Sequence, residues 1–218
     1  MATKKFEPLD FAIQKDSETI RKEVLENILK MIRYRGHIKW SDSDITKFIK
    51  IPLDNCEYTV KLDNKIVDPT GTNKEFKGNF IYIKLISQNI KSAKNNPILL
   101  QFIKNHMNDH KIVIFDDIVD KAKYELKNTY PHIEVFAQRF LMIDLMSHDA
   151  APASCSILSD EEAIKLRKEY HLTSQKMSKI KLNDKMSDYM NVSIGQVLKI
   201  QGRSQNNVYE TRYRIVYD

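Results

Sequence analysis

The sequence predicts a mixed α/β protein built from two units, and two observations carry this prediction. Between residues 80 and 136, β-branched apolar runs alternate with helical patterns, which is typical of parallel strands joined by helical crossovers. At residues 149–156 the composition becomes small, polar and proline-containing, and elements of different spacing follow. We therefore predict an α/β unit at residues 1–147 and a small mixed α/β unit at residues 148–218.

The composition is that of an ordinary globular protein. Of 218 residues, 42% are hydrophobic and 29% are charged, which disfavours disorder, collagen-like repeats and coiled coil. Lys and Arg outnumber Asp and Glu by 35 to 29, and this net charge of +6 suits contact with a polyanion without proving it. The two cysteines lack metal-ligand spacing, so neither zinc nor disulfides organise the fold. We expect an intracellular protein without a signal peptide, membrane span or cofactor.

The first two elements of the chain are predicted to be helices. Apolar residues recur every three or four positions between Ser17 and Gly36, which is typical of an amphipathic helix that a glycine ends. A second, short helix begins at Ser41, whose spacing to Asp44 is that of a capping box.

The rest of the first unit is predicted to be mainly strands and crossover helices. A β-hairpin is expected from residues 58–62 and 66–67, and a loop at residues 68–73 follows it. The near-continuous apolar run at residues 80–86 indicates a strand that is covered on both faces. The later elements are a helix at 98–107, a strand at 111–115, a helix at 119–127, a strand at 132–136 and an apolar segment to residue 146.

The second unit is predicted to combine helices with a terminal hairpin. Ser159 and Glu162 have the spacing of a capping box for a helix that runs to Tyr170. A short strand at 180–182 follows, and Asp184 is positioned to cap another short helix. Residues 196–200 and 209–217 are expected to form a hairpin joined through residues 203–207.

Two acidic clusters have the residue types of metal sites. Asp116 and Asp117 follow a buried strand, but a helix N-cap with an acidic first turn is the favoured interpretation. Asp68, Glu75 and Lys77 have the order of a restriction-type nuclease site, in which carboxylates hold a divalent metal and a lysine orients the attacking water. A turn and a polar loop explain these three residues as well. A metal-dependent nuclease is therefore kept as an alternative function.

A series of motifs in the second unit runs in an order that is characteristic of one family. The motifs occupy residues 148–152, 158–162, 170, 180, 184, 189, 195–200, 204 and 213–214. They resemble the assembly domain of the fifth-largest subunit shared by eukaryotic nuclear RNA polymerases, and are similar to its smaller counterpart in archaeal RNA polymerase. The family pattern Gly-(Asp/Gln)-Val-x-Lys-Ile, with Tyr-Arg near the end, can be followed without a gap from Gly195 to Arg214.

The sequence also departs from the family pattern. Ser154 stands in place of a second histidine, Lys185 in place of a proline and Asn191 in place of a glycine, and Arg203 lies next to the following serine instead of two residues before it. The first unit matches more loosely, at residues 33–37, 80 and 122–123. These departures indicate a divergent member, of cellular or large-DNA-virus origin.

The resemblance implies both a fold and a function. It implies a restriction-endonuclease-like jaw domain at residues 1–147, without that fold's active site, and an assembly domain at residues 148–218. The implied function is that of a non-catalytic subunit of a DNA-directed RNA polymerase, which docks on the largest subunit and supports downstream duplex DNA through weak, non-specific phosphate contacts. The implied location is the nucleus of a cell, or the virion and host cytoplasm of a virus.

The resemblance also implies site residues, none of them catalytic or metal-binding. Lys121 and Lys123 are expected to contact DNA phosphates, with a solvated helix face as the plainer interpretation. Residues expected at the interface with other polymerase subunits are His148, Pro152, Asp184, Gly195, Val197, Arg203, Tyr213 and Arg214. Val197 and Tyr213 are also candidates for the core. A free-standing DNA-binding module remains a third, weaker alternative.

Overall fold

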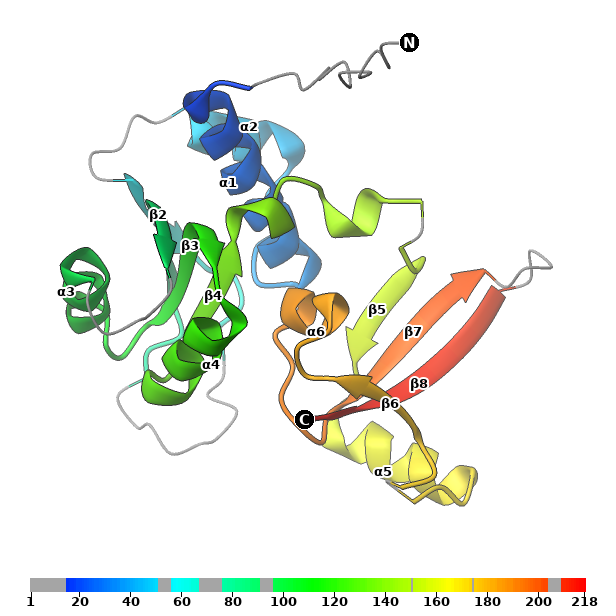
Figure 1. The fold of residues 1–218 in the computed structure, drawn as a ribbon. Helices are drawn as coiled ribbons and strands as arrows, with labels where there is room; N and C mark the ends of the chain where they lie inside the picture. The colour runs from blue at the N-terminus through cyan, green and yellow to red at the C-terminus, as the bar shows by residue number, and fades with distance from the viewer. Residues whose placement is uncertain are drawn as a thin grey trace, which may run out of the picture.

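Two four-stranded sheets organise the protein (Figure 1). The computed structural model describes residues 15–50, 56–66, 76–90, 96–149, 151–173, 175–203 and 209–218. The N-terminal sheet consists of β1 (Glu57–Lys61), β2 (Phe80–Ile90), β3 (His110–Ile118) and β4 (Ile133–Ala137), and the C-terminal sheet of β5 (Ser154–Ile157), β6 (Ser178–Lys181), β7 (Val197–Arg203) and β8 (Tyr209–Tyr217). The helices are α1 (Ser17–Tyr34), α2 (Asp42–Ile49), α3 (Pro97–Asn105), α4 (Asp120–Thr129), α5 (Asp160–Glu169) and α6 (Lys185–Met190).

The N-terminal sheet has the strand order β1-β2-β3-β4. Strands β2, β3 and β4 run parallel, and α3 and α4 connect them, which confirms the predicted crossovers. The predicted hairpin is wrong, because β1 pairs antiparallel with the first half of β2. Ile66 lies outside any strand and instead donates its backbone N–H to the carbonyl of Gly78 at 3.0 Å, while Val67 and the predicted loop at residues 68–73 fall outside the described residues.

Helices cover both faces of this sheet. Ile81, Ile83, Ile112 and Ile114 pack on the side of α1, whose buried residues include Ile28. The other face packs against α3 and α4, through a cluster that includes Val113, Phe115, Val135, Leu99, Phe102 and Leu126. The strand at residues 80–86 is therefore covered on both sides, as its apolar run predicted.

Strand β3 continues further than the sequence suggested. Asp116 and Asp117 lie within β3 with exposed side chains, so the N-cap interpretation of these two residues is wrong. The N-cap of α4 is Val119. Asp117 instead contacts Arg139, with 3.3 Å between the carboxylate and the guanidinium.

The C-terminal sheet has the strand order β5-β7-β8-β6. Strands β7 and β8 form the predicted antiparallel hairpin, and β6 adds parallel to β8. Strand β5 falls in the stretch interpreted as a boundary, where the backbone of Ser154–Ile157 pairs antiparallel with β7. Residues 204–208 of the expected connection lie outside the described residues.

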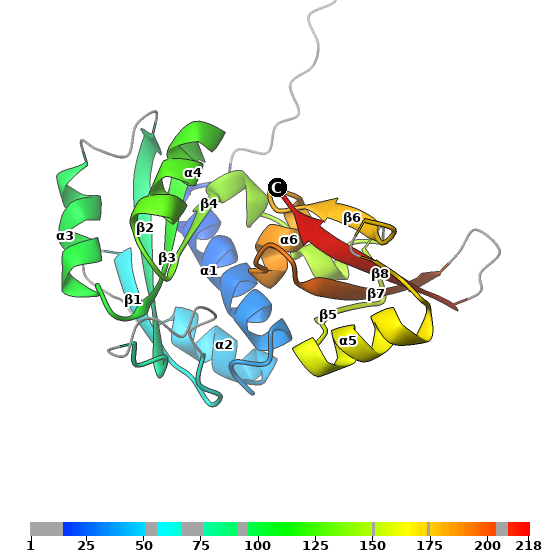
Figure 2. The same ribbon diagram turned by 90° about the horizontal axis from the view of Figure 1, so that it is seen from below.

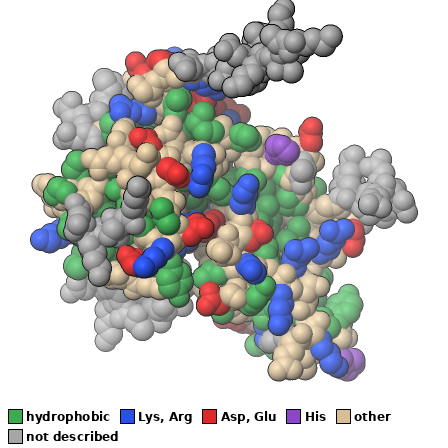
Figure 3. All heavy atoms as spheres, in the orientation of Figure 1, with side chains coloured by type: hydrophobic (Ala, Val, Ile, Leu, Met, Phe, Trp, Pro, Cys, Tyr) green, Lys and Arg blue, Asp and Glu red, His purple; other side chains and the backbone are tan. Residues whose placement is uncertain are grey.

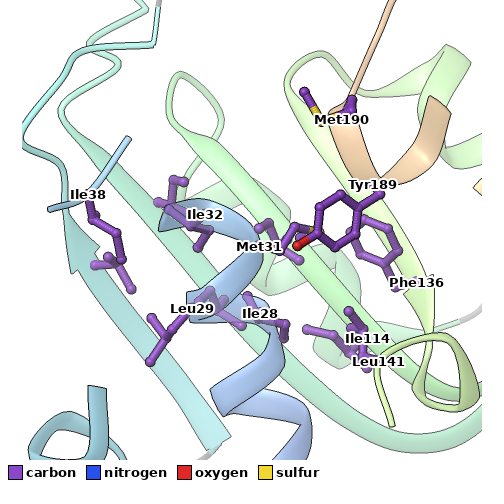
Figure 4. Packing of buried hydrophobic residues seen from close by; sticks show 14 of the residues in the cluster. Ile28, Leu29, Met31, Ile32, Ile38, Ile114, Phe136, Leu141, Tyr189 and Met190 are labelled. Carbon is purple, nitrogen blue, oxygen red and sulfur yellow. The ribbon is translucent and has the colours of Figure 1, made fainter. Parts of the chain in front are cut away.

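The two sheets share one hydrophobic core. Figure 2 shows α1 and α6 side by side between the two sheets. Tyr189 and Met190 of α6 lie beside Met31 of α1 and Phe136 of β4 (Figure 4). The C-terminal sheet contributes Cys155, Ile180, Leu198 and Val216 to the same cluster. The region after residue 147 therefore packs against the N-terminal region through α6 and one face of the C-terminal sheet.

Several predicted helix caps are present. Ser41 and Ser159 form capping boxes with Asp44 and Glu162, and the Asp184 carboxylate accepts from the backbone N–H of Met186. Such caps satisfy backbone N–H groups that have no partner within the helix. Among the helices that the structure describes, none is both long and apolar enough to cross a membrane.

Candidate docking face and nucleic-acid contacts

The two faces of the C-terminal sheet have different partners because successive side chains of a strand point to opposite sides. Val197 and Ile215 pack against Ala163 and Leu166 of α5. The opposite face carries Leu198 and Ile200 on β7 and, on β8, Val216 and the two arginines 212 and 214. Its apolar residues belong to the shared core or pack against it. The arginines lie further out along this same face.

A hollow of about 740 Å³ opens where this second face leaves the shared core. We call it the docking hollow, and its lining residues are Asp149, Ala151, Pro152, Ala153, Ile180, Asp184, Met186, Ile200, Gly202, Arg212 and Arg214. Three segments that are distant in sequence therefore meet here: the stretch before β5, residues 180–186 from β6 to the start of α6, and the outer half of the β7–β8 hairpin. Figure 3 shows basic side chains over the C-terminal sheet on this side of the molecule.

The docking hollow brings together three of the predicted interface residues. Pro152, Asp184 and Arg214 all line it, although the sequence separates the first and last by about sixty positions. The Asp184 side chain is exposed and caps α6, while Pro152 and Arg214 are half-buried. These three residues therefore share one surface, and their role at an interface stays a prediction.

His148 lines a second hollow beside the first. This hollow, of about 420 Å³, is lined by Arg139, Phe140, Ile143, Leu145, His148 and Lys185. The two hollows adjoin, because neighbouring residues 148 and 149, and likewise 184 and 185, line one each. Ile143 is 61% exposed, which leaves an apolar side chain open to a partner.

The remaining predicted interface residues lie elsewhere. Gly195 is exposed in a turn with φ of 89°, a left-handed conformation that favours glycine. Val197 is only 1% exposed, so its side chain belongs to the core against α5 and offers no surface. Tyr213 is half-buried against the same cluster. Arg203 ends β7, and its side chain is not among those that the structure describes.

Lys121 and Lys123 lie on α4 beside a third hollow, of about 470 Å³, which α4 forms with the β6–α6 turn. Lys121 is exposed. Lys123 and Lys127 both contact the Asp188 carboxylate of α6, at 2.5 and 2.8 Å. Positions four apart share a helix face, so both ammonium groups reach one carboxylate. Lys123 therefore joins α4 to α6 in this structure.

A second ionic cluster joins α1, β4 and α6. Arg35, just after α1, forms two hydrogen bonds to the Glu134 carboxylate of β4, at 2.7 and 2.8 Å. Arg35 also donates to the backbone carbonyls of Tyr189 and Asp188 in α6, at 2.7 and 3.1 Å. The side chains of Arg35 and Glu134 are each 3% exposed. The guanidinium therefore connects α1, β4 and α6 within the core.

The Glu134 carboxyl is ionised despite its burial. Burial alone raises the pKa of a carboxyl, but the charge of Arg35 and the hydrogen bond with His110 Nε2, at 2.7 Å, outweigh it. These partners hold the pKa of Glu134 well below its usual range. No sequence motif marked this cluster as a unit, because its members come from positions about a hundred residues apart. Arg35 itself stands in the segment 33–37 that carried part of the family resemblance.

Of the three residues of the nuclease alternative, only Lys77 falls within the described part of the chain. Asp68 and Glu75 lie outside the described residues, and Lys77 is exposed before β2. In the described ranges, no three His, Cys, Asp or Glu side chains are grouped so as to hold a metal ion. Neither the structure nor the family match supports this alternative.

Residues 143–216 match the family model described as RNA polymerase Rpb5, C-terminal domain. The match covers about the last third of the chain. It contains α5, α6, the C-terminal sheet except Tyr217 at the end of β8, and every residue that lines the docking hollow.

Proposed function

We propose that this chain is a non-catalytic subunit of a DNA-directed RNA polymerase. Its C-terminal region would dock on the largest subunit, and its N-terminal region would support downstream duplex DNA as a jaw. The match of residues 143–216 to the Rpb5 C-terminal domain indicates an RNA polymerase subunit and is the observation that carries this proposal. Nucleotide addition would belong to other subunits. The chain would work in the nucleus of a cell, or in the virion and host cytoplasm of a virus.

The docking hollow supports the docking part of the proposal. It lies within the matched residues and combines apolar side chains with charges of both signs, the mixed chemistry of a protein–protein contact. The adjoining apolar hollow around Ile143 extends this surface. Both hollows border the shared core and also have exposed lining residues, such as Asp149 and Ile143, so a partner would reach them from solvent.

The downstream-DNA part of the proposal rests mainly on Lys121. Its side chain is exposed on α4, whereas Lys123 is engaged by Asp188. Phosphate contacts by lysine are independent of base sequence and sensitive to salt. Lys121 would thus contribute one phosphate contact in the assembled polymerase, and Lys123 would do so only after leaving Asp188.

Affinity purification of the tagged full-length chain from its source cells or virions tests the function. Washing at moderate salt should leave the two large polymerase subunits in stoichiometric amounts, identified by mass spectrometry. Recovery of the chain alone, or with unrelated proteins, would refute the proposal.

A Lys121→Ala variant assembled into the polymerase tests the DNA contact. Loss of one phosphate contact should lower the slope of log affinity against log salt by about one for a non-specific downstream duplex. Lys165→Ala, an exposed lysine on α5, is the matched control and should leave the slope unchanged. An unchanged slope for Lys121→Ala would remove this residue from the DNA path.

A further inference from the structure

Two of the four charged groups in the docking hollow already have partners. The Arg212 guanidinium pairs with Glu210 at 2.7 Å, and the Asp184 carboxylate accepts the backbone N–H of Met186 at 2.9 Å. The side chains of Arg214 and Asp149 make no hydrogen bond or ion pair with any residue that the structure describes. Within the described part of the chain, the hollow therefore presents one unpaired cation and one unpaired anion.

Arg214 is the more constrained of these two groups. It is half-buried on β8, opposite Leu198 of β7, while Asp149 is exposed. Partial burial removes water from a guanidinium, and a carboxylate is the group that best replaces this water, because it accepts two parallel N–H bonds. Ile200 and Pro152 supply apolar surface within the same hollow.

From these groups we infer that the docking hollow binds an extended segment of a partner protein that carries a carboxylate side chain beside an apolar one. The carboxylate pairs with Arg214, and the apolar side chain packs on Ile200 and Pro152. A basic side chain of the same segment faces Asp149. This inference rests on the proposed function, in which the partner is another polymerase subunit.

A protein segment fits this hollow better than a nucleic acid does. The carboxylates of Asp149 and Asp184 stand beside the two arginines, and Glu210 already neutralises Arg212. A phosphate backbone would gain one free cation and meet two carboxylates, whereas binding of nucleic acid depends on several uncompensated cations. The two carboxylates and two guanidinium groups of the hollow are instead complementary to a polypeptide that carries charges of both signs.

Site-specific photo-cross-linking in the assembled complex tests which segment occupies the hollow. A benzophenone amino acid replaces Ala153, an exposed residue that lines the hollow, and in a parallel variant it replaces Ile164 on the outer face of α5. Position 153 should cross-link to a polymerase subunit within a few residues of an Asp or Glu, and position 164 should not reach that segment. A cross-link from position 153 to nucleic acid, or to a segment without acidic residues, would overturn the inference.

Charge substitution at Arg214 provides the second test. Arg214→Glu and Arg214→Gln should each lower recovery of the complex by about tenfold or more, because they leave the partner's carboxylate unpaired at an interface. Lys165→Glu is the control for a charge change on the same unit, on α5 across the sheet, and should leave recovery unchanged. Changing the cross-linked Asp or Glu of the partner to Lys should restore recovery with Arg214→Glu.

The outcomes separate this inference from the proposed function. If the wild-type chain recovers the polymerase and both Arg214 variants recover it equally well, the inference fails and the function stands. If the wild-type chain recovers no polymerase, the proposed function fails and the inference fails with it. Matching melting temperatures for the wild-type chain and the Arg214→Gln variant establish that any loss reflects docking and not folding.

Discussion

Lys111 lies in the core at the start of β3 with its ammonium group among backbone carbonyls. The side chain is fully buried, and Nζ donates to the carbonyls of His106, Met107, Asp109 and Pro131 at 3.0–3.3 Å. Burial lowers the pKa of Lys111 to about 8, although the nearby Asp109 charge opposes this shift. One side chain thereby fastens the α3–β3 turn to the loop before β4.

The lowered pKa of Lys111 gives a prediction for pH dependence. Between the folded-state pKa of about 8 and the ordinary value of 10.5, the unfolded chain binds more protons than the folded one. The contribution of Lys111 to the free energy of unfolding must therefore rise over this range. Urea unfolding of the wild type and of Lys111→Met at pH 7 to 10.5 should show the wild type gaining stability relative to the variant. If the difference in unfolding free energy between wild type and variant stayed constant or fell with pH, the lowered pKa of Lys111 would be contradicted.

Glu134 gives a prediction for the acid range. Glu134→Gln removes the negative charge and leaves Arg35 as a buried cation, which should cost about 3–5 kcal/mol of unfolding free energy. Because the folded-state pKa is lowered, the wild-type advantage is complete above the usual carboxyl pKa near 4.5 and shrinks as pH falls below it. Chemical denaturation at pH 7 and pH 3.5 measures both effects. Glu169→Gln, an exposed control at the end of α5, should change stability by less than about 0.5 kcal/mol.

At the scale of elements, helix α6 links the C-terminal sheet to the helices of the N-terminal region. Its backbone carbonyls accept from Arg35, its Asp188 accepts from two lysines of α4, and Tyr189 packs edge-on against Tyr34 of α1 with ring centroids 5.7 Å apart. A helix of only six residues would be unstable alone. Tertiary contacts therefore hold α6 in place.

Asp188→Asn tests this role of α6. The variant replaces two charge-assisted contacts with weaker ones, which should cost about 1–3 kcal/mol. Hydrogen exchange should accelerate at residues 185–190 and leave the β7–β8 hairpin little changed. The exposed Asp160→Asn in α5 serves as the control. Equal protection of residues 185–190 in wild type and Asp188→Asn would show that the ion pairs of Asp188 are not needed to hold the helix.

The elements that sequence predicted well are those defined by local patterns. The helix after Ser17, the capping boxes at Ser41 and Ser159 and the strands of the crossover region depend on residues close together in the chain, so their spacing reveals them. Pairing of distant strands leaves no such local signal. The sequence therefore predicts the wrong partner for β1, and it places most of β5 in a boundary because Ser154 and Cys155 have the small, polar composition of one.

The candidate site was predictable only in part, for the same reason. The family resemblance selected Pro152, Asp184 and Arg214, and the fold brings them to one hollow. The ion pairs of Lys123 with Asp188 and of Arg35 with Glu134 join residues that are 65 and 99 positions apart. The pattern of a single sequence does not reveal such pairs, because only the tertiary fold brings their two residues together.

At the scale of the whole molecule, the C-terminal region has only a small core of its own. Between its sheet and α5, the buried residues are Ala163, Leu166, Met177, Val197 and Ile215. The other face of that sheet contributes Cys155, Ile180, Leu198 and Val216 to the core shared with α1. Cutting the chain between residues 147 and 148 would expose this second face, at a cost of about 25 cal/mol for each Å² of apolar surface.

We therefore expect residues 148–218 alone to lack the cooperative fold that they have in the intact chain. A chain of this length is already marginal, and losing one covered face of its sheet removes much of its stabilisation. The fragment should show a broad thermal transition and rapid amide exchange in β7 and β8, whereas the full chain should unfold in one step with equal calorimetric and van't Hoff enthalpies. Adding residues 1–147 in trans should restore protection if the shared core is the missing part. A fragment that melts sharply by itself would instead make the region after residue 147 an independent domain, with α6 as its removable contact to α1.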